Sequence, residues 1–496
     1  MHKRFFPHLF TTYFSQIIGA LFGILVIKLI ALHLTPEDLG VFFTGKRIVN
    51  LGIPLLTLNL GMSLAKFNNR SPENAESLLL FSFFFVSSIF IVTFIFITII
   101  DGNIVAWLWN DLKYHYLFLG IWVLLYATAV STICSGYWRG VEDFGRMNLT
   151  NVSYQIMSVL VLLFTIIFEN QRIHFIVQYF LYNSVAIFLF NILILLFSNF
   201  PNKIRTIRFK GIIGKIKPIL RSFINFGIRR IPSGFFYMAI FFIPIIAASG
   251  FISLTMAAYI GIIISIANLL MLVGFPLNLL FLPKFSGFDA KMERKEILEK
   301  AQIVFDFSLS VVLLISPLLY FFVDEIIILL FNKSYMVIGP YMELFSLGVG
   351  PFLIFVILRG ILDGIENYPY INMITGVGMI VTIILSIGTI IFGWGMGGLT
   401  LAFTMGLILM GLGTIYIFLT RIKLQIMYKR NLISFGWVLL LYICFYGFKL
   451  FSQSQMTSTV ILAKGFIILL VGFLSIWIYK VNQYPWFVKA MKLFNK

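Results

Sequence analysis

Two adjacent arginines, Arg229 and Arg230, stand at the start of a long apolar stretch. The residues that follow, 231–283, include no Asp, Glu, Lys or Arg. This length is enough for roughly two membrane spans, since one span needs about 20 apolar residues. An arginine inside a membrane costs at least about 2.5–3.5 kcal/mol, so it usually faces a cavity and has a function. Arginine makes bidentate contacts to phosphate, so the pair indicates anion binding; the alternative is that both side chains reach back to anionic headgroups.

Three more cations and one acid lie within apolar stretches. Lys28 lies well inside the first stretch, and Lys46 and Arg47 lie in the early part of the second. Lys28 could instead extend outward to the membrane interface, and the other two could belong to an extended loop. Asp306, near the start of a later stretch, could pair with one of these cations, take part in ion coupling or cap its helix.

The composition is that of a polytopic helical membrane protein. Hydrophobic residues make up 60% of the chain and charged residues 11%, whereas soluble domains have an apolar share of about 45–50%. Long apolar stretches recur along the whole chain, while a β-barrel would show short alternating segments. The first stretch is too long for a signal peptide and lacks a small-residue cleavage site, so we expect it to be the first span. The two cysteines lie in apolar segments and indicate neither a disulfide framework nor a metal site.

We predict an all-α polytopic membrane protein with about 14 transmembrane helices. The predicted spans are 9–34, 41–64, 78–100, 116–138, 149–168, 175–197, 226–248, 255–281, 303–323, 343–362, 369–393, 397–420, 432–449 and 458–479. Most of the 37 lysines and arginines then lie in alternate loops, which would be cytoplasmic if the N-terminus is inside. External loops carry only Lys113, Arg172 and Lys333. This asymmetry predicts that both termini are cytoplasmic.

The two halves of the chain resemble each other at a nearly constant offset. Asn50 and Asn268 lie 218 residues apart, and the pairs Arg139–Gly140 and Arg359–Gly360 lie 220 apart. Six spans per repeat is an even number, so both halves enter the membrane in the same orientation. We therefore predict a parallel repeat with its pseudo-twofold axis along the membrane normal.

This repeat divides the chain into four parts. We predict an N-terminal six-helix lobe over 1–197, a basic cytoplasmic linker over 198–222, a C-terminal six-helix lobe over 223–420, and two further helices with a cytoplasmic tail over 421–496. The linker has seven cations and no acid. It is typical of an amphipathic segment that lies on anionic lipids at the cytoplasmic face.

Three motifs resemble a known family. LTPEDLGVF occurs at 34–42, FGIRRIPSG at 226–234 and FPLNLLFLPKFSG at 275–287. They are similar to the Multidrug/Oligosaccharidyl-lipid/Polysaccharide flippase superfamily, and within it to the O-antigen and capsular polysaccharide (Wzx-type) flippase branch, over roughly residues 9–420. The resemblance implies two lobes in a V, similar to multidrug exporters of the superfamily, around a cavity that opens alternately to the two faces. The chain departs from the pattern at the start of its first half, where Thr11 and Thr12 replace any cationic pair.

The resemblance also implies a substrate, an undecaprenyl-diphosphate-linked sugar moved across a bacterial inner membrane. The diphosphate would bind Arg229 and Arg230 on the cytoplasmic side and then Lys28, Lys46 and Arg47 as the outer side opens. No cofactor is implied, and coupling to H⁺ or Na⁺ stays open. The implied partners are the lipid-linked sugar, anionic lipids, the polysaccharide polymerase and the chain-length regulator, and none is a nucleic acid.

Three other functions stay open. A flippase for the peptidoglycan precursor lipid II resembles the same plan. A cation-coupled multidrug exporter favours acids deep in the membrane, whereas the first span carries Lys28 and no acid. A membrane glycosyltransferase or polymerase would need a large external loop with catalytic groups. No P-loop, GxSxG or HExxH motif occurs in a suitable context, so we do not expect an enzyme.

Overall fold

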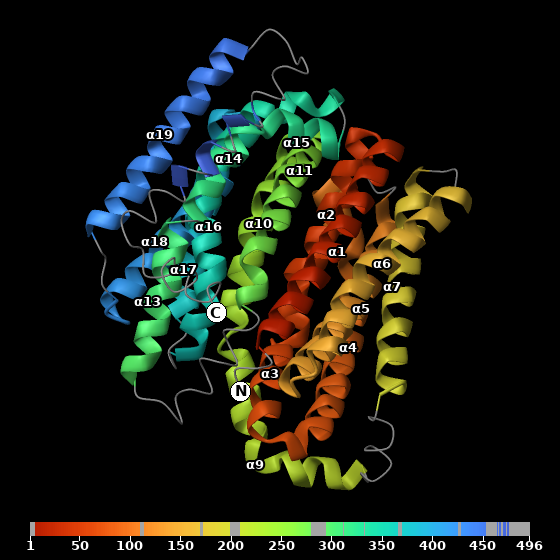
Figure 1. The fold of residues 1–496 in the computed structure, drawn as a ribbon. Helices are drawn as coiled ribbons and strands as arrows, with labels where there is room; N and C mark the ends of the chain where they lie inside the picture. Colours follow the sequence, from red (N-terminus) through yellow and green to blue (C-terminus); the bar gives the residue numbers. More distant parts are fainter. Residues whose placement is uncertain are drawn as a thin grey trace.

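The computed structural model is almost entirely helical and confirms the predicted all-α membrane fold. It describes residues 5–109, 114–168, 172–198, 209–278, 294–310, 312–331, 333–365, 370–424, 428–452 and parts of 464–475. The helices run roughly parallel and form one bundle (Figure 1). In that view the helices of the first half lie on the right and those of the second half lie mainly on the left, with α9 below them.

The first half of the bundle contains six long helices and a short one. They are α1 (Phe5–His33), α2 (Pro36–Thr57), α3 (Leu60–Arg70), α4 (Ala75–Trp109), α5 (His115–Gly140), α6 (Phe144–Phe168) and α7 (Arg172–Leu196). The start of α2 follows from its sequence. Thr35 caps the helix by accepting a hydrogen bond from the backbone N–H of Asp38, and Pro36 occupies the first turn, where it removes no helical hydrogen bond.

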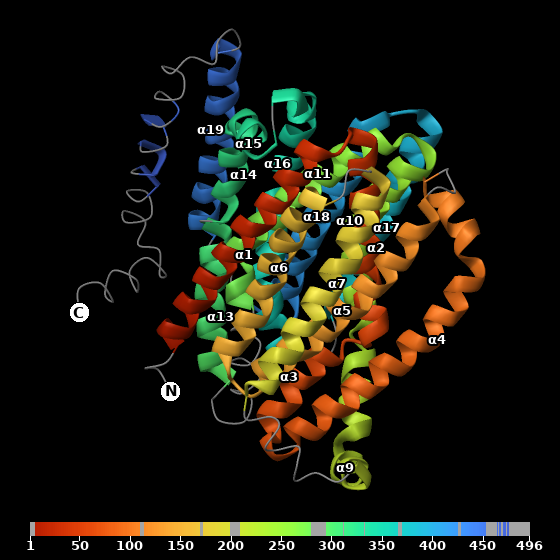
Figure 2. The same ribbon diagram turned by 90° about the vertical axis from the view of Figure 1, so that its right-hand side faces the viewer.

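The second half contains more interruptions. Its helices are α9 (Phe209–Ile228), α10 (Ile231–Phe251), α11 (Leu254–Leu270), η4 (Met271–Val273), α13 (Arg294–Ser310), η5 (Val312–Leu314), α14 (Ile315–Phe321), α15 (Val323–Leu330), η6 (Lys333–Ile338), α16 (Gly339–Ile365), α17 (Tyr370–Phe392), α18 (Gly395–Thr420) and α19 (Tyr428–Ser452). Viewed from the side, α19 stands at the edge of the bundle (Figure 2).

Within the described residues, twelve segments are long and apolar enough to cross a membrane. Each of them overlaps one of the first twelve predicted spans. The predicted total of about 14 is not confirmed: α19 contains only a shorter apolar helix, Ile433–Lys449, and most of the predicted span 458–479 lies outside the described residues.

Two helix breaks meet between the halves. The prediction of one unbroken span over 41–64 is wrong, because Leu58 and Asn59 adopt φ values of 45° and 53° and separate α2 from α3. The second break separates α9 from α10 at residues 229–230. Asn59 Nδ2 donates a 2.8 Å hydrogen bond to the carbonyl of Arg230, and a Cβ at Gly227 would lie 2.5 Å from the carbonyl oxygen of Leu58. Each break therefore stabilises the other across the interface.

Corresponding helices make corresponding contacts in the two halves. Helix α1 packs against α6 as α10 packs against α17, and α5 packs against α7 as α16 packs against α18. Asn148 Nδ2 donates to Thr12 Oγ1 at 3.3 Å, and Asn372 Nδ2 donates to the carbonyl of Arg229 at 2.9 Å. This is the pattern that a parallel repeat predicts; the four boundaries proposed for the chain stay a prediction.

Candidate anion-binding cavity

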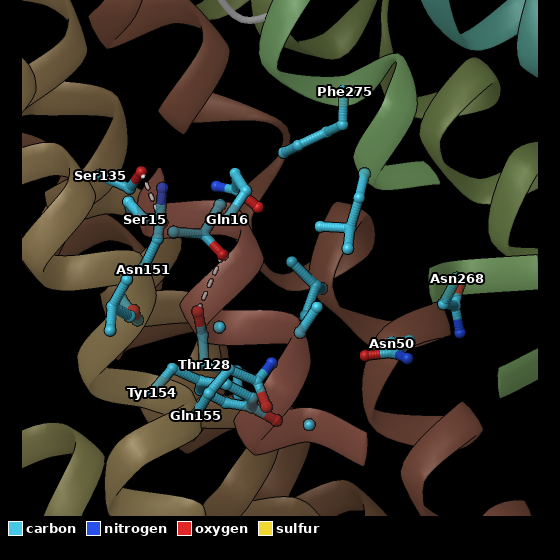
Figure 3. A pocket seen from close by; sticks show the side chains of 18 of the residues that line it. Ser15, Gln16, Asn50, Thr128, Ser135, Asn151, Tyr154, Gln155, Asn268 and Phe275 are labelled. Atoms are coloured by element: carbon cyan, nitrogen blue, oxygen red, sulfur yellow. Dashed lines mark hydrogen bonds between the residues drawn. The ribbon is translucent and has the colours of Figure 1, made fainter. Parts of the chain in front are cut away.

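A cavity of about 570 Å³ lies between the halves. Helices α1, α2, α3, α5 and α6 line it on one side, and α11 with the segment after it lines the other. Its wall is rich in hydroxyl and amide groups: Ser15, Gln16, Asn50, Thr128, Ser131, Thr132, Ser135, Asn151, Tyr154, Gln155, Ser265 and Asn268. Figure 3 shows that most of the labelled polar side chains come from the first half. Such a wall can donate hydrogen bonds to a polar ligand and accept them from it.

Glycines on α1 leave the space that the cavity needs. Gly19 and Gly23 both line it. A Cβ at Gly23 would lie 3.4 Å from Gln155 Oε1, and a Cβ at Gly19 would lie 3.7 Å from the same side chain. Larger residues at these two positions would fill the space beside the amide of Gln155.

The charged residues that line the cavity are all cationic: Lys46, Arg47 and Arg139. The Arg47 side chain is buried, with 5% of the residue exposed, and its Nε has no hydrogen-bond partner among the described residues. Lys46 Nζ lies 5.9 Å from the ring of Phe42. Among the residues that the structure describes, no Asp or Glu belongs to the lining. A buried cation without a counter-charge is costly, so the cavity is suited to an anion.

The end of the bundle opposite α9 is tightly packed. The lining residues begin at Lys46 on α2 and at Ser265 on α11, well after each helix starts. Gly40 on α2 and Leu254 on α11 lie before these lining residues. A Cβ at Gly40 would lie 2.0 Å from the carbonyl oxygen of Leu254. The two helices are therefore in close backbone contact there, between the cavity and the predicted outer face.

The structure brings together some of the predicted anion ligands. Lys46 and Arg47 line the cavity. This agrees with the expectation that a cation within a membrane span faces a cavity. Arg230 lies outside the lining; its guanidinium carbon stands 3.9 Å from the ring of Phe226, and its Nε lies 3.6 Å from Asp363 Oδ1. Arg229 is exposed, at the break between α9 and α10.

Lys28 and Asp306 lie away from the cavity lining. Lys28 Nζ donates a 3.2 Å hydrogen bond to the carbonyl of Leu329 at the C-terminal end of α15, where a cation is favourable. Asp306 is 3% exposed, and its Oδ1 accepts a 3.0 Å hydrogen bond from Gln302 Nε2. Among the described residues, neither side chain belongs to the group that lines the cavity.

Sequence reasoning missed three charged residues at or beside the cavity. The sequence pattern gives Arg139 and Arg359 a place only in the internal repeat, and it gives Asp363 no role. In the structure Arg139 lines the cavity, and Arg359 Nε lies 3.8 Å from Asp363 Oδ2. The internal repeat is a sequence signal for these two arginines, because Arg139 and Arg359 recur at an offset of 220 residues.

The amides Asn50 and Asn268 give a second example of this signal. They recur at an offset of 218 residues, both line the cavity, and Figure 3 shows them beside each other. The repeat therefore marks positions near the interface between the halves.

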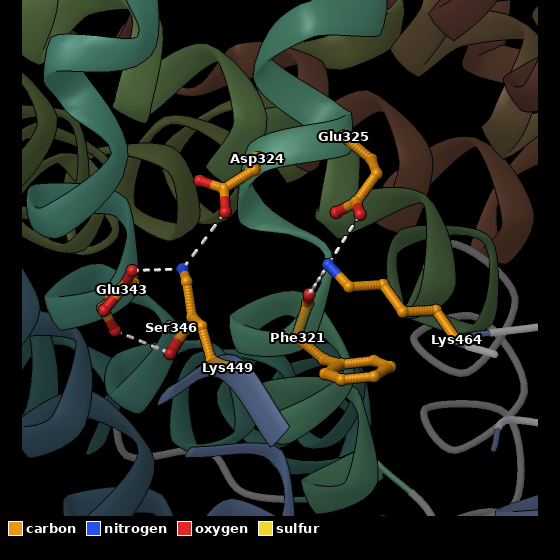
Figure 4. Close-up of polar contacts among 7 residues, drawn as sticks. All are labelled: Phe321, Asp324, Glu325, Glu343, Ser346, Lys449 and Lys464. Carbon is orange, nitrogen blue, oxygen red and sulfur yellow. Dashed lines mark hydrogen bonds and ion pairs between the residues drawn. The ribbon is translucent and has the colours of Figure 1, made fainter. Parts of the chain in front are cut away.

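A second ionic cluster fixes the C-terminal segment to α15 and α16. Lys449 lies 3.4 Å from Asp324 Oδ2 and also pairs with Glu343 (Figure 4). Lys464 pairs with Glu325 at 2.5 Å and donates a 3.1 Å hydrogen bond to the carbonyl of Phe321. Within the described residues, no group of three or more His, Cys, Asp or Glu side chains is suited to a metal ion.

No family model matches the sequence. No curated protein matches it either.

Solved structures of membrane transporters are similar in fold. The lipid II flippase MurJ in an inward closed conformation has a TM-score of 0.63 at 15% identity and covers 98% of this chain and 100% of its own. An inward-facing multidrug resistance MATE family transporter of the MOP superfamily has a TM-score of 0.60 at 13% identity, over 80% of this chain and 93% of its own. A MATE transporter of Vibrio cholerae has a TM-score of 0.56 at 12% identity, over 84% and 97%. The chain thus has the fold of MOP superfamily transporters and flippases, while the O-antigen branch stays a prediction.

Proposed function

We propose that the protein is a flippase that moves an undecaprenyl-diphosphate-linked oligosaccharide, a repeat unit of O-antigen, capsule or exopolysaccharide, by alternating access. Movement runs from the cytoplasmic to the outer leaflet of a bacterial inner membrane. The observation that carries the proposal is Arg47, a buried arginine whose Nε has no hydrogen-bond partner among the described residues. It lies in a cavity that also holds Lys46 and Arg139 and whose lining, within the described part of the chain, has no acid. A diphosphate would supply the counter-charge, and its oxygens match the planar donors of arginine.

The polar wall supports a sugar as the other part of the substrate. Gln16, Asn151 and Gln155 line the cavity with amide groups, which can both donate to hydroxyls and accept from them. A diphosphate at Lys46 and Arg47 would leave these amides for the sugar.

The remaining predicted ligands fit earlier and later steps of transport. We propose that exposed Arg229 meets the headgroup of the substrate at the cytoplasmic surface, and that anionic lipids of the same surface contact α9. We further propose that Lys28 receives the diphosphate only after α1 separates from α15, since its ammonium now bonds to Leu329. Contact with a polymerase and a chain-length regulator also stays a proposal.

The second candidate is a lipid II flippase. It is favoured by the coverage of the fold comparison, because MurJ matches 98% of this chain whereas the MATE transporter matches 80%. Both candidates require an anion in the cavity, so they differ in the sugar. A multidrug exporter for cations is less compatible with a lining that carries three cations and no acid among the described residues.

Replacing Arg47 tests the proposal. We expect Arg47→Gln to weaken binding of inorganic pyrophosphate by the purified protein about 10- to 150-fold, because a hydrogen bond to a charged group contributes about 1.5–3 kcal/mol. Arg47→Lys should retain part of the affinity, since the charge remains while the planar fork is lost. Calorimetric titration measures both.

A matched control and a cellular assay complete the test. Arg421→Gln removes an exposed arginine at the end of α18 and should leave pyrophosphate binding unchanged. In a strain lacking its O-antigen flippase, the wild-type gene should restore surface polysaccharide and the Arg47→Gln variant should not. Full activity of that variant at normal protein level would contradict the proposal, while rescue of only a strain lacking its lipid II flippase would favour the second candidate.

A further inference from the structure

A carboxylate shared by two arginines lies beside the cavity. Asp363 Oδ1 lies 3.6 Å from Arg230 Nε, and its Oδ2 lies 3.8 Å from Arg359 Nε. The side chains of Asp363 and Arg230 are 7% and 6% exposed, and that of Arg359 is 18% exposed. Charge-assisted hydrogen bonds are about 2.7–2.9 Å long. Asp363 therefore balances charge on both arginines without a short hydrogen bond to either Nε.

Of the two arginines, Arg230 has an unused hydrogen-bond donor among the described residues, its Nε. Their other contacts are with aromatic rings: Arg230 stacks on Phe226, and the guanidinium carbon of Arg359 lies 5.6 Å and 5.8 Å from the rings of Tyr237 and Phe355. Within the described part of the chain, Arg230 Nε is buried without a hydrogen-bond partner. Guanidinium groups held in this way can still offer N–H donors to an anion.

The shared carboxylate is electrostatically connected to the cavity. Arg139, which lines the cavity, interacts with Asp363 and Arg359. On the other side, the ring of Tyr237 contacts Arg359 and is within electrostatic reach of Arg47, which is also a lining residue. Three arginines, Arg230, Arg359 and Arg139, thus lie within electrostatic reach of Asp363 at the boundary between the halves, and a phosphate in the cavity would be attracted to them.

We propose that Asp363 is a resident counter-anion, which the phosphate of the substrate displaces from Arg230 and Arg359. The inference rests on the proposed function. Without substrate, Asp363 lowers the cost of burying the two arginines. With substrate, their planar N–H groups turn to phosphate oxygens, and Asp363 pairs with them again as the substrate leaves. Competition by Asp363 keeps binding weak enough for release, as transport requires.

The experiment measures pyrophosphate affinity of the purified full-length protein. Asp363→Asn keeps the shape of the side chain and removes the competing charge, so we expect the Kd for pyrophosphate to fall about tenfold. Asp363→Glu keeps the charge and should leave the Kd nearly unchanged. A purely structural ion pair predicts the opposite result, a lower melting temperature with unchanged or weaker binding. A gain in affinity therefore separates competition from scaffolding.

The outcomes separate this inference from the proposed function. Suppose that the wild type binds pyrophosphate, the Arg47→Gln variant does not, and the Asp363→Asn variant binds it no more tightly than the wild type. The counter-anion role is then wrong, and the anion-binding cavity is still supported. Equal gains in the Asn and Glu variants would also refute competition. If the wild type shows no saturable binding, the anion cavity falls and the counter-anion role falls with it. Should the Asn variant not fold, Asp363→Thr carries the same expectation.

Discussion

Gly40 is the position where a single methyl group should shift the balance between closed and open cavities. A Cβ at Gly40 would lie 2.0 Å from the carbonyl oxygen of Leu254, and a Cβ at Gly261 would lie 2.5 Å from the ring of Phe43. Both contacts join α2 to α11 at the end opposite α9. Because the atom that Gly40 would meet is backbone, no side chain can rotate away, and the two helices must separate.

The expected size of the effect follows from the contact. Relief to an ordinary separation requires a shift of more than about 1 Å, and overpacking of this kind typically costs about 1–3 kcal/mol. The open state, in which α2 and α11 are apart at this end, does not bear that cost. Gly40→Ala should therefore raise the open-to-closed ratio about 5- to 150-fold.

Cysteine labelling at the interface measures this ratio. Ala258 is fully buried on α11, one turn after Leu254, so Ala258→Cys reacts with an impermeant maleimide only when the helices part. Exposed Cys444 is replaced by Ser, while buried Cys134 is kept. The labelling rate of Ala258→Cys should rise in the Gly40→Ala background by the factor given above.

Gly388 is the matched control. It lies inside α17, and a Cβ there would meet nothing within 4 Å, so Gly388→Ala should leave labelling unchanged. Equal labelling in the Gly40→Ala and wild-type backgrounds, with both proteins folded, would show that this glycine contact does not hold the outer end closed. An equal rise in Gly388→Ala would point to a general loosening of the bundle.

Two further substitutions test the charged residues outside the cavity. Asp306→Asn should reduce transport in the complementation assay only partly, because Asp306 lies outside the cavity lining and its carboxylate is held by Gln302; complete loss with normal protein level would make it a coupling site. Lys449→Met leaves the carboxylates of Asp324 and Glu343 without this lysine and should lower the unfolding free energy by about 1–3 kcal/mol; a melting curve no different from that of Arg421→Met would contradict a role in fixing α19.

The sequence predicts the helices of the second half well where apolar runs end at strong local signals. The predicted spans 369–393 and 397–420 agree closely with α17 and α18. The turn between them contains Gly393 and Gly395, with φ values of 67° and 56°, which glycine adopts without strain. Local chemistry is sufficient at such places.

Other features depend on residues far apart in the chain. The break at Asn59 is stabilised by the carbonyl of Arg230, so no local pattern could predict it within an apolar run. Lys28 looked like an anion ligand because it is a cation in a span, yet its partner is a carbonyl on α15. Asp363 became a candidate only when the fold placed its carboxylate between two arginines. The place of Lys46 and Arg47 at the cavity agrees with the expectation that an intramembrane cation faces a polar environment, while their role as ligands stays a prediction.

The helix break at Arg229 and Arg230 also bears on how the chain is inserted during synthesis. The 36-residue segment Ile216–Phe251 contains an apolar window long enough to cross a membrane, and the whole segment would be about 54 Å long if helical throughout. A bilayer core of about 30 Å could accept such a segment in several registers. Moving the arginine pair toward the centre costs about 2.5–3.5 kcal/mol per residue, so the pair selects the register in which α10 spans and α9 stays at the surface. Exposed Arg229 would then fix the depth of α10 before any substrate is met.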